Sequence, residues 1–255
     1  MEREDDAFMV GMILWKNPEK GGGAGTIRER SILRVRFWCA EIARGPHTPE
    51  AVLRRRVRSA GKRLRKQGVT RLVLPEQFEE MPQLEKQGLG PASTLGLRKS
   101  IAADWVRWLL NSGGRGTAGA KIGVSADRLT GEVVRTVTEL ALRHRYVLLD
   151  LPKGGEELAR QLRREYGVSL LLNPSKEQME ETDALVVFDA GGDWESCRML
   201  PLYDETSPLP PLMLPPALEE KLPEGCRRGQ LLAVLREQGG LRPGQITVGG
   251  GNSAK

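Results

Sequence analysis

Four apolar runs decide the fold class: KIGVS at 121–125, YVLLD at 146–150, VSLLL at 168–172 and ALVVFD at 184–189. Each has the length of a buried strand, and the first three are followed by stretches with helical periodicity. Strands that alternate with helices form a parallel sheet, and ligands bind such sheets beyond the carboxyl ends of the strands. The alternation predicts an α/β fold with a mostly parallel sheet and crossover helices.

The first half of the chain carries a second βα pattern. Residues 31–40 (SILRVRFWCA) alternate between apolar and polar residues, which predicts a strand. Thr48 and Pro49 then form an N-cap and first-turn signature, which predicts a helix over 48–67. A second strand is expected at 71–74. The two halves form one sheet or two lobes, and the Gly-rich connector between them favours two lobes.

Composition shifts divide the chain into four expected segments. Glycines at 21–23 and 25 resemble a linker, and seven prolines crowd residues 201–225. The apolar stretch at 7–15 is too short for a signal peptide and follows acidic residues, which leaves a strand or a loosely attached leader. We expect a flexible leader (1–26), a βα half with a basic helix (27–118), a Rossmann-like half (119–200) and a Pro-rich C-terminal segment with one helix and a frayed tail (201–255).

The overall composition indicates a globular protein without a membrane span. Apolar residues make up 39% and charged residues 28% of the 255 residues, and no apolar run approaches the length of a membrane helix. The three cysteines and two histidines show no zinc-binding spacing, so no metal site is predicted. Reduced thiols are typical of a cytoplasmic protein of bacterial type.

Positive charge is concentrated in the first half and on one helix. Residues 1–120 carry 22 Lys and Arg against 13 Asp and Glu, whereas residues 121–255 carry 17 against 20. At about 100° per residue the apolar residues of helix 48–67 share one arc and most basic residues an adjacent one. This face is either solvated or binds nucleic acid, an acidic protein or anionic lipid. Its candidate residues are Arg54, Arg55, Arg58, Lys62, Arg65 and Lys66.

One literal GxGxxG occurs, at Gly114–Gly119. In dinucleotide-binding units this motif follows a strand and opens a helix, so that backbone amides meet the pyrophosphate. Here the glycines follow a predicted helix and precede a predicted strand. The reversed order favours an interdomain linker.

The loop in the correct position for a phosphate is SADRLTG at 125–131, after the first strand of the second half. It lacks the glycines that admit a pyrophosphate. Ser125, Arg128 and Thr130 at a helix N-terminus could hold a single phosphate or carboxylate. The alternative is ordinary helix capping by Asp127 or Thr130.

Asp150 ends the next strand, 25 residues after Ser125. In Rossmann-type folds an acidic residue at this place accepts the ribose hydroxyls. In strand order and in Asp150, residues 120–190 resemble a Rossmann-like domain. The glycine loop of that family is absent from the expected position, so NAD(P) is one candidate and the cofactor is left open.

A third group of polar residues follows the last apolar run. Asp189 ends that strand, and a turn with Gly191 and Gly192 comes next. Such a carboxylate either contacts a ligand or caps the loop locally. If Asp150 and Asp189 are neighbours, they form a pair that recognises hydroxyls or a cation. The predicted ligand-binding residues are Ser125, Asp127, Arg128, Thr130, Asp150, Asp189, Gly191 and Gly192.

No catalytic motif accompanies these features. The chain lacks GxSxG, HExxH, a P-loop and an EF-hand loop, so catalytic residues are unassigned. The leading hypothesis is a Rossmann-like protein that binds a small anionic ligand, such as a nucleotide, at the carboxyl edge of its sheet. The alternative is a non-catalytic protein that docks on nucleic acid or an acidic partner through helix 48–67. A relative of a cofactor enzyme that has lost the glycine loop is a third hypothesis.

Overall fold

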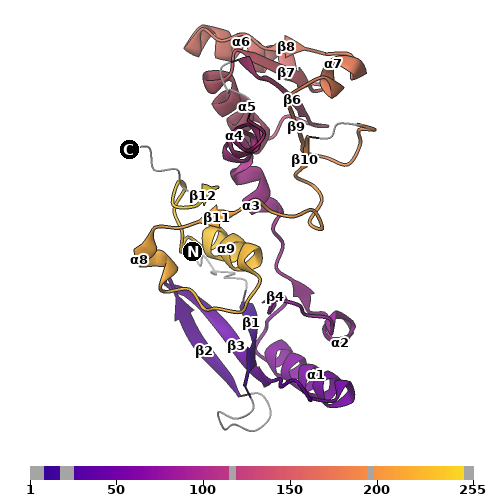
Figure 1. Ribbon diagram of the computed structural model, residues 1–255, viewed down its shortest axis with the longest axis vertical. Helices are drawn as coiled ribbons and strands as arrows, with labels where there is room; N and C mark the ends of the chain where they lie inside the picture. The colour runs from indigo at the N-terminus through magenta and orange to yellow at the C-terminus, as the bar shows by residue number, and fades with distance from the viewer. Residues whose placement is uncertain (1–8, 18–25, 115–118, 195–197, 250–255) are drawn as a thin grey trace, which may run out of the picture. The chain divides into compact units, whose positions relative to one another are not determined.

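The computed structural model describes residues 9–17, 26–114, 119–194 and 198–249 (Figure 1). The chain divides into two compact units, Met1–Thr94 with Leu214–Gln245 and Leu95–Met213 with Ile246–Lys255. Each unit has its own mostly parallel sheet, which confirms the predicted fold class. The division falls after Thr94 rather than at 118, and the segment expected over 201–255 contributes to both units.

The first unit is built on a five-stranded sheet of order β2-β3-β1-β4-β5. Strands β3, β1, β4 and β5 are parallel, and β2 is an antiparallel edge strand. The strands are β1 (Val10–Lys16), β2 (Ile27–Ile32), β3 (Val35–Ala43), β4 (Arg71–Val73) and β5 (Gly90–Pro91).

The central strand β1 lies within the stretch that we expected to be a leader. Val10, Met12 and Ile13 are at most 1% exposed, and β1 pairs with β3 on one side and β4 on the other. A strand that is covered on both faces needs no polar alternation. Its short apolar run is therefore indistinguishable, by pattern alone, from a leader segment.

The stretch 31–40 forms a hairpin rather than the single strand that we predicted. Leu33 and Arg34 have φ of 47° and 70° and form the turn between β2 and β3. Two successive residues with positive φ are typical of a two-residue hairpin loop, which glycine or asparagine usually occupies. Leu and Arg give no such signal, so the turn was missed.

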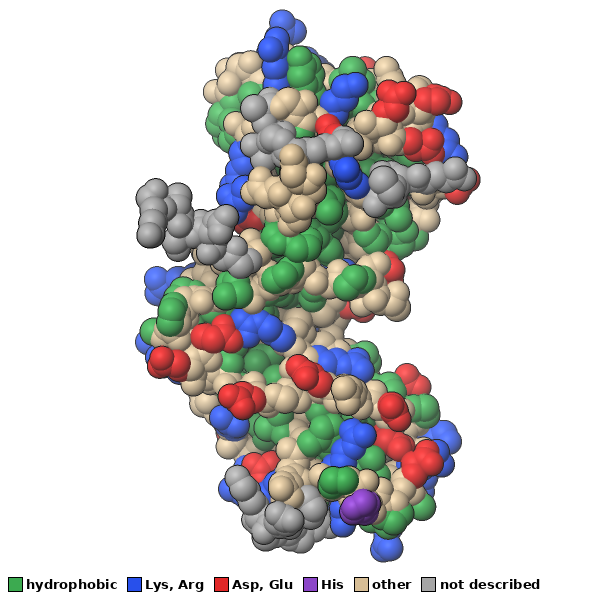
Figure 2. Space-filling model, in the orientation of Figure 1, with side chains coloured by type: hydrophobic (Ala, Val, Ile, Leu, Met, Phe, Trp, Pro, Cys, Tyr) green, Lys and Arg blue, Asp and Glu red, His purple; other side chains and the backbone are tan. Residues whose placement is uncertain are grey.

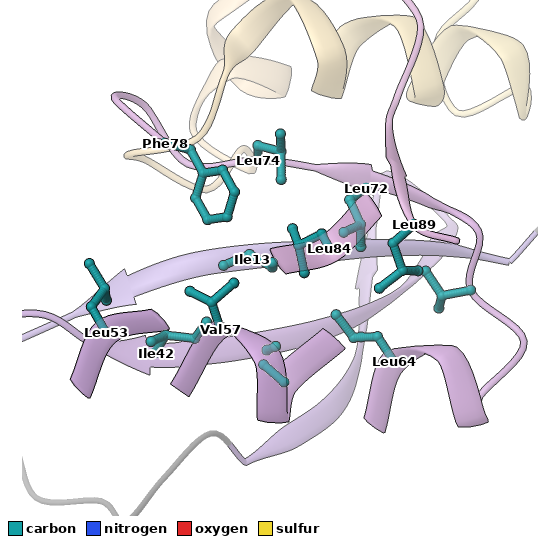
Figure 3. Close-up of a cluster of buried hydrophobic side chains, with 13 residues drawn as sticks. Ile13, Ile42, Leu53, Val57, Leu64, Leu72, Leu74, Phe78, Leu84 and Leu89 are labelled. Carbon is teal, nitrogen blue, oxygen red and sulfur yellow. The ribbon is translucent and has the colours of Figure 1, made fainter. Parts of the chain in front are cut away.

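Helix α1 (Glu50–Lys66) covers one face of this sheet with the predicted apolar arc. Leu53, Val57 and Leu64 pack there against Ile13 and Leu72 (Figure 3). Its N-cap is Pro49 without a side-chain hydrogen bond, whereas the Thr48 hydroxyl accepts from the Gly45 amide. The other helices of the unit are α2 (Met81–Glu85), α8 (Pro216–Glu219) and α9 (Arg228–Glu237).

Residues 214–245 return to the first unit, and α9 lies among them. The Leu74 amide donates to Gln230 Oε1 over 3.0 Å, and the Arg227 amide donates to the Leu74 carbonyl over 2.8 Å. Arg71 donates to Glu237 over 3.0 Å. The residues around α9 are thus tied to β4 and the residue after it.

The second unit contains five parallel strands in the order β10-β9-β6-β7-β8. After β6 the chain adds β7 and β8 on one side of that strand. It then crosses over and adds β9 and β10 on the other side, which is the Rossmann strand order. The strands are β6 (Lys121–Ser125), β7 (Tyr146–Asp150), β8 (Leu171–Leu172), β9 (Ala184–Val187) and β10 (Met199–Pro201).

The local helix signals of the second unit are mostly confirmed. Thr130 caps α5, Ser175 forms a capping box with Gln178 on α7, and Gly154 and Gly167 flank α6 in left-handed conformations. The elements are α3 (Leu95–Ser100), α4 (Ala102–Ser112), α5 (Gly131–Arg143), α6 (Gly155–Tyr166), α7 (Lys176–Glu180) and the antiparallel pair β11 (Leu212–Met213) and β12 (Thr247–Val248). Within the described ranges, no helix has both the length and the apolarity of a membrane span.

Candidate functional site

The carboxyl edge of the second sheet has its topological switch point between β6 and β9. The chain leaves β6 toward β7 on one side, and β9 lies against β6 on the other. Ligands of open α/β sheets bind in the crevice outside the strand ends at such a point. The loops that follow β6 and β9 contain most of the predicted ligand-binding residues.

Ser125 and Asp150 meet where β6 and β7 end. The Ser125 hydroxyl donates to Asp150 Oδ2 over 3.1 Å, and the Ala126 amide donates to the Asp150 carbonyl over 3.1 Å. Ser125 is buried, whereas Asp150 is half-buried. These bonds hold the Asp150 carboxylate at the sheet edge. Within the described chain, its Oδ1 has no hydrogen-bond partner and can accept from a ligand hydroxyl.

Asp127 and Asp189 meet on the other side of β6. The Asp127 amide donates to Asp189 Oδ2 over 3.0 Å. A methyl group on Gly191 would lie 3.2 Å from Asp127 Oδ1, and one on Gly192 would overlap the Trp194 indole. The two glycines therefore allow close approach of side chains. This gives them a packing role beyond the flexible turn that we predicted.

The N-terminus of α5 opens toward the same edge. The Thr130 hydroxyl accepts from the Val133 amide over 3.3 Å, which makes Thr130 the cap and leaves Asp127 outside that role. Among the residues that the structure describes, the amides of Gly131 and Glu132 have no acceptor. Free amides at a helix N-terminus favour an anion.

The loop after β6 contains the cation Arg128, and the loop after β7 contains the cation Lys153. Leu129 packs on Gly154, where an added methyl group would lie 3.0 Å from Leu129 Cδ2. The exposed side chains of Arg128 and Lys153 precede these two contact residues in the sequence. Sequence reasoning identified Arg128 and passed over Lys153, because only the contact between the loops relates the second loop to the first.

Asp150 ends β7 and Asp189 follows β9, and these two strands lie on opposite sides of β6. The pair that we considered stays a prediction. Two strand spacings separate their backbones by about 10 Å. The described residues contain no group of three His, Cys, Asp or Glu side chains that could hold a metal ion.

The other predicted sites lie elsewhere. The six basic candidates are all exposed on α1 of the first unit, and they do not join the ligand site. Residues 115–118 of the glycine motif lie outside the described residues, as do residues 1–8 and 18–25 of the expected leader and residues 250–255 of the expected tail.

A cavity in the first unit was missed by sequence reasoning. It has a volume of about 490 Å³ and is lined by Trp15, Arg44 and Glu80 among others. Trp15 stacks on Phe78 at 5.6 Å between ring centroids, and the Arg44 guanidinium lies 5.0 Å from the Trp15 ring centroid. Because Trp15 belongs to β1, the cavity could not be found without recognising that strand.

Comparisons with known proteins give no family for this chain. No family model matches it, and no curated protein matches it in sequence. Solved structures with partial similarity include L-tryptophan dehydrogenase from Nostoc punctiforme, with 12% identity and a TM-score of 0.27, over 58% of this chain and 44% of that one. The chain thus spans less than half of that protein.

Two further structures cover similar shares of the chain. Shikimate 5-dehydrogenase from Listeria monocytogenes has 10% identity and a TM-score of 0.28 over 74% of this chain and 71% of that one. NAD-dependent formate dehydrogenase from Staphylococcus aureus has 10% identity and a TM-score of 0.31 over 70% and 63%. Similarity this low carries no argument about ligand or reaction. The Rossmann-like assignment rests on the strand order.

Proposed function

We propose that the second unit binds a small, hydroxylated anionic ligand, such as a mononucleotide or a sugar phosphate, at the carboxyl edge beside β6. The observation that carries this proposal is the topological switch point between β6 and β9. Asp150 at the end of β7 and the N-terminus of α5 lie at the same edge of the sheet. Asp150 would accept the ligand hydroxyls, and the amides of Gly131 and Glu132 would receive the anionic group.

The charges favour one phosphate over a pyrophosphate. Arg128 and Lys153 supply positive charge near the loops, whereas Asp127 places a carboxylate within the loop after β6. In dinucleotide-binding units, glycine at this place lets the backbone approach the pyrophosphate. A side chain with negative charge opposes that approach. NAD(P) should therefore bind no more tightly than a mononucleotide.

Isothermal titration with AMP, ribose 5-phosphate, inorganic phosphate and NAD tests the proposal. We expect AMP and ribose 5-phosphate to bind, and Asp150→Asn to weaken both because a charged hydrogen-bond acceptor is lost. A charge-assisted bond is worth about 1.5–3 kcal/mol, which corresponds to about a 10- to 100-fold loss of affinity. Because the amide oxygen of the substituted side chain can still accept from Ser125, the variant should keep its melting temperature.

Two further variants separate the hydroxyl and anion contacts. Arg128→Gln should weaken every phosphate-containing ligand, inorganic phosphate included, whereas Asp150→Asn should leave inorganic phosphate unchanged. Arg163→Gln, which removes an exposed arginine from α6, is the matched control and should change nothing. Absence of binding to AMP and ribose 5-phosphate, or binding that survives both site variants, contradicts the proposal.

A further inference from the structure

Helix α1 separates an apolar face from a charged face. Leu53, Val57 and Leu64 are buried against the first sheet (Figure 3). Ala60 and Gly61 of the same helix are also buried. Acidic side chains are interspersed with Lys and Arg over the surface drawn in Figure 2, so basic residues by themselves do not distinguish this helix. What distinguishes it is how its cations are paired.

Most of the arginines on the flanks of α1 are engaged with neighbouring groups. Arg54 pairs with Glu50 and Glu80, and Arg56, Arg58 and Arg65 donate to the Ala43 carbonyl, Gln83 Oε1 and the Val69 carbonyl, respectively. Three cations differ from these. The side chains of Arg55, Lys62 and Lys66 are exposed and have no hydrogen bond or ion pair with any residue in the described ranges. We call these three residues the basic stripe.

The basic stripe is a single line along the helix. At about 100° per residue, positions 55, 62 and 66 fall within about 40° of one another, directly opposite the buried arc. At about 1.5 Å per residue they span about 16 Å along the axis. Ser59 lies along the stripe between Arg55 and Lys62, so no bulky side chain there obstructs an approaching surface.

The residue types exposed on this face favour one class of binding partner over the others. An amphipathic helix binds a lipid surface through its apolar side, and on α1 that side is buried in the protein core. A protein interface is anchored by aromatic or large apolar residues. On α1 the exposed apolar residue is Val52, which is 39% exposed and lies in the first turn, before the stripe begins. Contacts to nucleic-acid phosphates need only positive charge that can approach the backbone.

We propose that α1 binds the phosphate backbone of duplex nucleic acid through Arg55, Lys62 and Lys66, independently of base sequence. The stripe belongs to the first unit, so this proposal does not depend on the ligand site of the second unit. The expected complex is held by phosphate contacts alone. Its affinity should fall steeply with salt, because each neutralised phosphate releases a counterion.

The test measures binding of the full chain to a fluorescent 20-base-pair DNA of arbitrary sequence at several salt concentrations. Three phosphate contacts predict a slope of log K against log salt of about −2.7, which is about a 40-fold loss of affinity between 50 and 200 mM salt. The triple variant Arg55→Gln, Lys62→Gln, Lys66→Gln should lose this binding. The charge-conserving variant Arg55→Lys, Lys62→Arg, Lys66→Arg should retain it.

A matched control removes the same charge from other exposed positions. The triple variant Arg163→Gln, Lys221→Gln, Arg242→Gln should bind DNA like the wild type. Equal losses in both triple variants would show a response to net charge and would overturn the proposal. It would also be overturned if DNA did not bind at 50 mM salt, or if an acidic polyglutamate peptide bound the stripe and DNA did not.

Discussion

The two sheets of this protein have a central strand with both neighbours parallel to it, yet their carboxyl edges differ in chemistry. Beside β1, the Arg54 guanidinium pairs with the Glu80 carboxylate, and the Arg44 guanidinium lies over the Trp15 ring. Beside β6, Asp150 and Asp189 are held by Ser125 and by the Asp127 amide, and the N-terminus of α5 stays open. Two sheets of similar strand order can therefore differ in how far the polar groups at their carboxyl edges are paired with one another.

The largest expected effects come from removing a buried side chain from the core of each sheet in turn. Ile13 in β1 and Ile122 in β6 are both fully buried. Replacing a buried isoleucine by alanine removes apolar contacts and leaves a cavity, so Ile13→Ala and Ile122→Ala should each cost about 2–5 kcal/mol. Urea unfolding would give the size of the loss, and hydrogen exchange would assign it to the first or the second sheet.

If Ile13→Ala cost less than about 1 kcal/mol while Ile122→Ala had its full effect, β1 would not be the central strand of the first core. A loss of exchange protection in both sheets from either variant would show that the two units unfold together.

Glycines in the two central strands, Gly11 in β1 and Gly123 in β6, test how tightly each core is packed. A methyl group on Gly11 would lie 2.6 Å from Leu72 and 2.9 Å from Val69, and one on Gly123 would lie 2.9 Å from Leu185. Overpacking of this kind costs about 1–3 kcal/mol. Gly11→Ala should destabilise more than Gly123→Ala, because the shortest contact is closer at Gly11, and two of the three contacts at Gly123 are with the end of the flexible Met179 side chain at 3.3 Å. Urea denaturation would measure both.

Gly96→Ala in α3 provides the control, because no atom lies within 4 Å of the added methyl group. We expect it to stabilise the protein slightly through the lower entropy of the unfolded chain. Equal effects at positions 11 and 96 would contradict the packing argument.

Helix caps also distinguish the two units, with a smaller effect. Thr130 caps α5 through its side chain, whereas α1 begins at Pro49 without such a bond. Thr130→Ala should lower the free energy of unfolding by about 1 kcal/mol in a urea denaturation experiment, and Thr130→Ser should retain most of the stability. If the serine variant were as unstable as the alanine variant, the hydroxyl would not be the source of the effect.

The remaining effect concerns pH and the first unit only. Burial raises the pKa of the Cys39 thiol to about 11, with Glu41 and Cys226 adding to the rise and Arg30 opposing it. A raised thiol pKa means that the folded state holds its proton more tightly than the unfolded state. Stability should therefore fall as the pH rises between about 9 and 11.

The measurement is chemical unfolding of the wild type and of Cys39→Ala at pH 8 and at pH 10.5. Between pH 8 and pH 10.5 the wild type should lose more of its free energy of unfolding than Cys39→Ala does, because the variant has no thiol to ionise at this position. A constant difference would contradict the raised pKa of Cys39.

Much of the second unit could be predicted, because its signals are local. A threonine before a helical pattern, a serine with a glutamine three residues later and glycines at both ends of α6 each act within one turn of the chain. The strand ends at Ser125 and Asp150 follow from the apolar runs. Which oxygen each side chain bonds does not follow from them, because Asp127 and Asp189 meet only through the pairing of β6 with β9.

The first unit was harder because its deciding features are not local. β1 becomes a central strand only through β3 and β4, which follow it by tens of residues in the chain. The hairpin turn at Leu33 and Arg34 adopts positive φ without glycine, since the paired strands on either side hold it there. The cavity beside Trp15 depends on the first of these outcomes, because Trp15 belongs to β1.

Local sequence pattern was sufficient to predict the class of fold, the apolar and charged faces of α1 and the candidate residues at the ends of β6, β7 and β9, because periodicity and caps act over a few residues. Contacts between distant segments place ten of the described strands in two separate five-stranded sheets, make β1 central to one of them, and determine which cations and carboxylates are paired. Those outcomes depend on contacts between distant segments, whose free energy is set by burial and neighbouring charge rather than by local pattern.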